Sequence, residues 1–135
     1  MIKKRLNFLI DGASRGNPGP AGYGVAIYDM KWQKTDELKG HLGTHTNNFA
    51  EYSALIKALE YALEHDVTCV RIFTDSELVA EQMTGRYKIR SKNIIPLVTR
   101  AFSLVRKLQS FEIKKIPREK NKVADALANE AIDAQ

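Results

Sequence analysis

The spacing of apolar residues changes near residue 46, and this change limits the chain to folds in which helices cover a sheet. Before it, three β-prone segments at 5–11, 23–28 and about 33–42 are separated by a Gly/Pro-rich loop, Gly12 to Gly22, and a short polar turn. Short connections of this kind join antiparallel strands. After it, apolar residues from Phe49 to Leu63 recur three or four positions apart, which predicts an amphipathic helix.

The remaining sequence alternates between strand-like and helical patterns. Strands are predicted at 67–74 and 111–116, and helices at 76–83, 92–108 and 121–134. We expect the strands that follow helices to pair in parallel with the first strand. The predicted fold is therefore α/β, a five-stranded mixed sheet of three antiparallel strands plus two parallel strands, flanked by helices, in a single domain over residues 1–135.

The composition and the N-terminal sequence predict the compartment of the protein and the charge of its partner. No apolar run approaches the ~20 residues that span a bilayer, and the basic N-terminus lacks a signal-peptide pattern. Cys69 is the only cysteine, so we expect a reduced, cytoplasmic protein without membrane attachment. Residues 84–122 hold 12 Lys or Arg and only 2 Glu, while the rest of the chain is net negative. From charge alone, a nucleic-acid partner and a solvated basic surface explain this segment equally well.

Two aspartates stand at the ends of predicted strands. Asp11 follows the run Phe8-Leu9-Ile10, and Asp75 follows the strand that ends at Thr74. If these strands are parallel neighbours, both carboxylates lie at the edge of the sheet where ligand sites collect. Each also has a purely structural explanation: Asp11 as a turn residue, and Asp75 with Ser76 as a helix cap.

Two further acids begin predicted helices. Glu51 lies three residues after Asn48, which fits a capping box, and Asp125 lies early in the last helix, where a negative charge suits the helix dipole. Residues 46–48 and Asn121 supply capping groups. These local roles give no reason for four acids to converge. Convergence would build a site of hard oxygen ligands suited to Mg²⁺ or Mn²⁺, and two such ions roughly 4 Å apart can catalyse phosphodiester hydrolysis.

Four motifs resemble, in order, those of type 1 ribonuclease H. They are Asp11 to Gly24 (DGASRGNPGPAGYG), Thr46 to Glu51 (TNNFAE), Thr74 to Ser76 (TDS) and Asn121 to Ala128 (NKVADALA). The resemblance covers essentially the whole chain, and the order of predicted elements agrees with it. It implies a ribonuclease H-like fold and an enzyme that cleaves the RNA strand of RNA/DNA hybrids with two Mg²⁺ or Mn²⁺ ions, leaving 3′-hydroxyl and 5′-phosphate ends.

The resemblance also implies roles for individual residues. Asp11 would bridge the two ions, Asp125 would join it on the ion that activates water, and Glu51 and Asp75 would join it on the ion at the leaving group. Substrate contacts would come from Gly12, Ala13, Ser14, Asn17, Thr46, Asn47, Asn48, Ser76 and Glu77. The hybrid would be recognised through the 2′-hydroxyl of RNA, which DNA lacks. We expect a monomer that needs no small-molecule cofactor.

The chain resembles the short members of that family, which lack a Trp-rich basic insertion and an N-terminal hybrid-binding domain. Arg86, Lys88 and Arg90 stand where the insertion would be, and we expect them to contact backbone phosphates. Many members also carry a histidine in the loop before the last aspartate, and this chain does not. Glu119 is the predicted proton relay there, with Arg118 as the alternative. The histidines are expected at the surface or in loops: His41, His45 and His65.

Two other functions are compatible with the sequence. One is a non-catalytic hybrid-binding module with a decayed site, against which the complete set of four acids argues. The other is a nuclease of the same fold that acts on DNA, whereas the Gly/Pro-rich loop with Asn47 and Asn48 favours RNA. A serine nucleophile is unsupported, because neither Ser14 nor Ser76 has a partner histidine.

Overall fold

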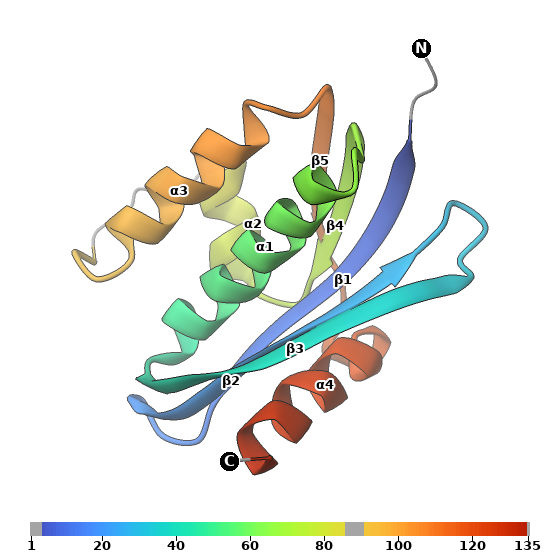
Figure 1. Cartoon of the computed structure of the whole chain (residues 1–135). Helices are drawn as coiled ribbons and strands as arrows, with labels where there is room; N and C mark the ends of the chain where they lie inside the picture. Colours follow the sequence, from blue (N-terminus) through green and yellow to red (C-terminus); the bar gives the residue numbers. More distant parts are fainter. Residues whose placement is uncertain (1–3, 86–90, 135) are drawn as a thin grey trace.

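The computed structural model consists of one sheet with helices on both faces (Figure 1). It describes residues 4–85 and 91–134. The strands are β1 (Arg5–Ser14), β2 (Gly19–Tyr28), β3 (Lys34–His45), β4 (Cys69–Thr74) and β5 (Ser110–Lys115). The helices are α1 (Asn47–Glu64), α2 (Glu77–Met83), α3 (Ile95–Val105) and α4 (Lys122–Asp133), with a 3₁₀ turn, Arg118–Lys120, before α4. In Figure 1, α1, α2 and α3 lie on one face of the sheet and α4 lies on the other.

The strands follow the order β3-β2-β1-β4-β5. β2 pairs antiparallel with β1 and β3, while β4 pairs in parallel with β1 and β5. This arrangement confirms the predicted five-stranded mixed sheet and the predicted order of elements. Because β1 is central and parallel to β4, the carboxyl ends of these two strands lie side by side.

The central strand is buried on both faces. Phe8 and Ile10 point into the larger core, which α1 and α3 cover, and both are fully buried. Leu9 points into a smaller core with Ala124 and Leu127 of α4. Strands buried on both faces read as continuous apolar runs, which explains the unbroken run before Asp11.

The helix α1 begins at a capping residue, as predicted. The Thr46 hydroxyl accepts a hydrogen bond from the amide of Phe49 (3.2 Å). The apolar positions with helical spacing supply the buried face of this helix. Neither α1 nor any other helix within the described ranges is long and apolar enough to span a membrane.

Some predicted boundaries are wrong. The segment Gly12 to Gly22 is mostly strand, because β1 continues to Ser14 and β2 starts at Gly19, so that only residues 15–18 connect them. Its glycines predicted a turn, but strand pairing uses backbone groups that glycine also has. The helix predicted at 92–108 is shorter: α3 ends at Val105, and the chain then tightens into turns, with the Lys107 amide donating to a carbonyl three residues back (3.0 Å).

Two glycines, Gly12 in this segment and Gly24 further along β2, allow helices to approach the sheet closely. A Cβ on Gly12 would lie 2.1 Å from the carbonyl carbon of Ala50 in α1. A Cβ on Gly24 would lie 2.4 Å from the carbonyl oxygen of Ala124 in α4. Real Cβ atoms do not come so close, so both helices take these positions only because glycine has no side chain. In both helices, the next residue is one of the predicted carboxylate ligands.

Candidate active site

The ends of β1 and β4 bring Asp11 and Asp75 together. Ile10 pairs with Thr74 in the parallel ladder, so the residues that follow them occupy the same edge of the sheet. Asp11 is only 5% exposed, and Asp75 is half-buried. Ser76 alone caps α2, since its hydroxyl accepts a hydrogen bond from an amide in the first turn (3.2 Å). Asp75 is therefore not needed as a cap.

Glu51 does not form the capping box that its spacing from Asn48 would allow. The N-cap of α1 is Thr46, so the helix has already begun before Asn48 and Glu51 lies beyond its first turn. The Glu51 carboxylate instead reaches the sheet, where Oε1 accepts a hydrogen bond from the amide of Gly12 (3.3 Å). Glu51 is buried there beside Asp11.

Asp125 extends from the first turn of α4 toward the same place. It is half-buried and lines the same cavity as Asp11, whose pKa it helps to raise. Asn121, just before α4, does not cap the helix with its side chain, which corrects the prediction. Its buried amide donates to the carbonyl oxygen of Ile10 (2.8 Å), and its side chain lies close to Asp75, whose pKa it lowers. Asn121 thereby links the start of α4 to the ends of β1 and β4.

Burial and mutual repulsion disfavour the ionised forms of these acids. Burial, followed by the negative charge of Glu51, raises the pKa of Asp11 far above its usual value, and Asp125 and Asp75 add to the rise. Burial likewise raises the pKa of Glu51 and of Asp75, while the guanidinium of Arg118 partly offsets the rise in both. The cluster therefore favours either protons or a cation.

The arrangement fits a divalent metal ion. Asp11, Glu51 and Asp75 can each offer an oxygen within 4.8 Å of those of the other two. Glu51 Oε2 is buried and has no hydrogen-bond partner within residues 4–85 and 91–134. A cation bound to this oxygen would satisfy it and would neutralise the repulsion among the acids. An all-carboxylate set is typical of sites for hard cations such as Mg²⁺ and Mn²⁺.

A cavity of about 670 Å³ lies beside the carboxylates. All four acids line it, together with seven of the predicted substrate contacts: Gly12, Ala13, Ser14, Asn17, Asn47, Asn48 and Ser76. Two predicted contacts are not among its lining residues: Thr46 and Glu77. The three predicted phosphate contacts lie outside the described residues: Arg86, Lys88 and Arg90.

The loop between β1 and β2 is fastened by side chains that were predicted to contact substrate. Asn17 Oδ1 accepts a hydrogen bond from the amide of Asn47 (3.1 Å), which ties the loop to the start of α1. Ser14 Oγ lies within hydrogen-bonding distance of the carbonyl oxygens of His45 (2.7 Å) and Gly16. Because its hydroxyl proton is used inside the protein, Ser14 could contact a ligand only as an acceptor or through its backbone.

The loop before α4 places Arg118 on the cavity. Arg118 is among the lining residues, whereas Glu119, the predicted relay, is not. None of the three histidines lines the cavity either. The His45 ring stacks on Phe49 with ring centroids 3.7 Å apart, and His65 follows the last turn of α1.

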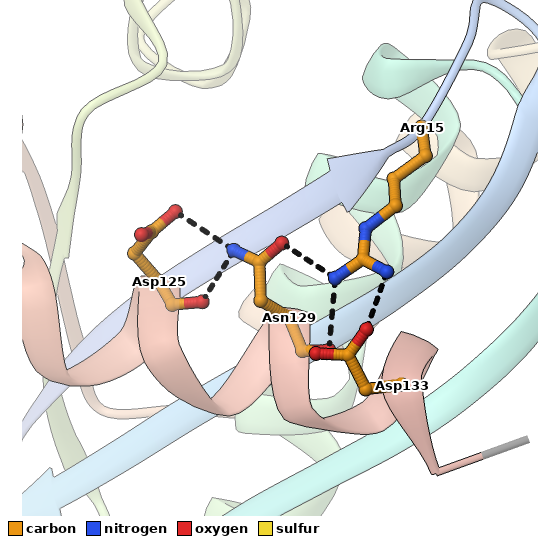
Figure 2. A network of polar contacts seen from close by, with 4 residues as sticks. All are labelled: Arg15, Asp125, Asn129 and Asp133. Carbon is orange, nitrogen blue, oxygen red and sulfur yellow. Dashed lines mark hydrogen bonds and ion pairs between the residues drawn. The ribbon is translucent and has the colours of Figure 1, made fainter.

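Arg15 and Asn129 also line the cavity, and the sequence patterns did not reveal them (Figure 2). Asn129 lies one turn after Asp125 on α4, and its Nδ2 contacts that residue. Arg15, in the loop after β1, forms an ion pair with Asp133 and reaches Asn129. The spacing of four residues on a helix was the available signal for Asn129. No sequence signal pointed to Arg15, because its contact with Asn129 joins positions 114 residues apart.

Comparisons with known proteins agree with this arrangement. A family model described as reverse transcriptase-like matches residues 9–131. Ribonuclease HI of Halobacterium salinarum is 40% identical over 129 residues, which are 96% of this chain and 65% of that protein. The bifunctional protein Rv2228c of Mycobacterium tuberculosis is 41% identical over 125 residues, which are 92% of this chain and 34% of that protein. The chain thus spans about a third of the length of one relative and somewhat under two thirds of the other.

Solved structures share the fold over nearly the full length of the chain. The crystal structure of RNase H1 from Halobacterium salinarum has a TM-score of 0.94 at 39% identity, covering 97% of this chain and 99% of that one. The structure of LC11-RNase H1 in complex with an RNA/DNA hybrid has a TM-score of 0.90 at 40% identity, covering 96% of this chain and 97% of that one.

Proposed function

The chain belongs to the type 1 ribonuclease H family, and from this membership we propose that it is an endonuclease that cleaves the RNA strand of RNA/DNA hybrids. The products would carry 3′-hydroxyl and 5′-phosphate ends. One observation carries the proposal: four acids from separate elements line one cavity, beside a buried Glu51 oxygen that has no partner among the described residues. The hybrid bound to LC11-RNase H1, which is 40% identical to this chain, supports the hybrid as substrate.

Asp11, Glu51, Asp75 and Asp125 would hold two Mg²⁺ or Mn²⁺ ions. Such ions, when bound, activate water and stabilise the leaving oxygen of a phosphodiester. Uncharged groups of the protein hold the acids in position. The Gly12 amide, for example, donates a hydrogen bond to Glu51. Burial of Asp11 and Glu51 lowers the local dielectric, which strengthens their attraction for a cation.

Other groups on the cavity suit the phosphates and sugars of the substrate. The guanidinium of Arg118 can pair with a phosphate oxygen. Asn17, Asn47 and Asn48 place amide groups beside the acids, where they would bond the RNA 2′-hydroxyl. A DNA strand would leave these groups unpaired, and such sites discriminate strongly against the analogue that lacks the hydroxyl. The proposed contact surface is completed by Gly12, Ala13, Ser14, Thr46, Ser76 and Glu77.

A substrate comparison tests the proposal. The purified protein is incubated with Mg²⁺ or Mn²⁺ and one sequence prepared as an RNA/DNA hybrid, as double-stranded RNA and as double-stranded DNA. We expect efficient cleavage only of the RNA strand of the hybrid, and none in the presence of a chelator. Hybrid binding without cleavage under any metal condition would identify a non-catalytic module. Preferential cleavage of DNA would identify a DNA-acting nuclease, and either result would overturn the proposal.

A further inference from the structure

A chain of polar contacts connects the loop after β1 to Asp125 (Figure 2). Asn129 Nδ2 donates to the backbone oxygen of Asp125 (3.0 Å) and lies 3.4 Å from its carboxylate Oδ1. On its other side, Asn129 Oδ1 lies 3.4 Å from Nη2 of Arg15. Arg15 also forms an ion pair with Asp133, one turn further along α4.

The chemistry of these groups determines which way the Asn129 amide faces. A guanidinium can only donate hydrogen bonds, so it must meet the oxygen of the amide. The NH₂ group then faces Asp125, whose backbone oxygen and carboxylate Oδ1 are the acceptors. The reversed amide would set NH₂ against Arg15 and oxygen against Asp125, so both contacts would become unfavourable. Arg15 therefore selects the orientation in which Asn129 donates to Asp125.

Asp125 has particular need of such a contact. Asp11 and Glu51 are almost completely buried, and Glu51 is also held by a backbone amide. Asp125 is half-buried on a helix, where its side chain has more freedom to turn. It also stands outside the group of three acids whose oxygens approach within 4.8 Å in the described part of the chain.

We propose that Asn129 is a positioning residue that directs the Asp125 carboxylate toward the metal site, and that Arg15 acts through Asn129 by fixing its amide. This inference rests on the proposed function, because it takes Asp125 as a metal ligand. It also ties Asp125 to the loop that carries Asn17, a proposed substrate contact. Groups that orient metal ligands typically contribute 10–100-fold to metal affinity or activity.

The first test replaces the amide. For Asn129→Ala we measure the Mn²⁺ concentration that gives half of the maximal thermal stabilisation of the substrate-free protein, and the concentration that gives half-maximal cleavage of a hybrid. Both should rise about tenfold, at the lower end of the usual range because the contact is long and partly exposed. At saturating Mn²⁺, kcat should lie within a few-fold of the parent and KM for the hybrid should be unchanged. Asn129→Gln should recover part of the affinity, since Gln and Asp four residues apart on a helix can still hydrogen-bond.

Glu130→Ala is the matched control. Glu130 is the next residue on α4, is exposed, and makes a comparable surface contact with Lys39 (3.8 Å). We expect it to leave both Mn²⁺ concentrations unchanged. If Asn129→Ala behaves like Glu130→Ala while the parent binds Mn²⁺ and cleaves the hybrid, the positioning role is wrong and the proposed function stands. If the parent neither binds metal nor cleaves, the proposed function itself fails.

A double-mutant cycle tests the part assigned to Arg15. Arg15→Ala should shift the Mn²⁺ concentrations in the same direction as Asn129→Ala but less. The double variant should show no larger shift than Asn129→Ala alone, because Arg15 acts through the amide that is already gone. Shifts that multiply would mean that Arg15 acts independently, which overturns this part. Arg15 is exposed in a loop, so we expect Arg15→Ala to fold. If Asn129→Ala does not fold, the combination of Arg15→Ala with Asn129→Gln still tests whether Arg15 acts through residue 129.

Discussion

Asp11 and Gly24 lie directly opposite each other in the antiparallel ladder between β1 and β2. The missing side chain of Gly24 leaves room for the backbone of α4, which passes at Ala124. The residue after Ala124 is Asp125, so the glycine opposite one acid determines how closely a second acid can approach it. The distance between Asp11 and Asp125 therefore depends on Gly24, a residue without a side chain.

Gly24→Ala should both destabilise the protein and lower its activity. The added methyl would overlap backbone atoms of α4, and overpacking of this kind costs about 1–3 kcal/mol of unfolding free energy. Thermal melting and hybrid cleavage measure the two effects. Gly40→Ala is the control, because the three atoms nearest to its methyl would belong to the end of the partly exposed Tyr23 side chain and not to a helix backbone. Parent-like melting and turnover in Gly24→Ala would show that α4 does not depend on this close approach.

Asp75→Asn should abolish turnover and leave the fold intact. The amide keeps the shape of the side chain but loses the charge that would hold a metal, and Asp75 is not needed to cap α2. Cleavage of a labelled hybrid and a melting curve provide the measurements. Asp66→Asn is a suitable control, because Asp66 is exposed and has a positive φ that asparagine also tolerates. Substantial remaining activity, or a melting temperature far below that of the parent, would contradict the assignment of Asp75.

The metal-free protein should lose stability as the pH rises, and Asp11 should cause part of the loss. The pKa of Asp11 is raised in the folded state, so above the unfolded-state pKa of about 4 the native protein holds a proton that the unfolded chain releases. Stability therefore falls as the pH rises from there toward the raised pKa. Asp11→Asn should melt several degrees above the parent near pH 8 in chelator, with a smaller difference near pH 4.5. Mn²⁺ should raise the melting temperature of the parent much more than that of the variant, and equal pH dependence in the two proteins would argue against this account.

Arg118→Ala should lower turnover more than Glu119→Gln does. Arg118 lines the cavity and its charge acts on Glu51 and Asp75, whereas Glu119 is absent from the lining. Steady-state kinetics on one hybrid, with both variants and the parent at saturating metal, measures the difference. The relay role of Glu119 stays a prediction: a large fall in kcat for Glu119→Gln without a change in KM would support it and would refute our preference for Arg118.

The order of elements was predictable because helix and strand periods differ and each predicted segment was long enough to show one of them. The boundaries near the first aspartate were not, because the Gly/Pro-rich run from Gly12 to Gly22 has the composition of a turn. Gly12 in that run and Gly24 in β2 are instead glycines where α1 and α4 approach the sheet, and these contacts join residues far apart in the sequence. The pattern could not reveal this packing.

The places of the four acids at strand ends and helix starts were compatible with a site, and the four family motifs singled the acids out, but their supports were not predictable. Asn121 stood where a cap belongs, yet its amide donates a hydrogen bond to the sheet, beside Asp75. Asn48 and Glu51 had the spacing of a capping box, yet α1 starts earlier and Glu51 faces the sheet. The same local spacing is compatible with a helix cap and with a contact to the sheet, and only tertiary contacts distinguish the two.

The four acids are spread from position 11 to position 125, so no short fragment of the chain contains them all. An ion held by the whole set would connect β1, α1, the end of β4 and α4. Its binding free energy would therefore add to the unfolding free energy of the entire domain instead of stabilising one local segment. During synthesis the cluster stays incomplete until α4 has left the ribosome and packed on the sheet. A growing chain would thus be unable to cut a hybrid before α4 is in place.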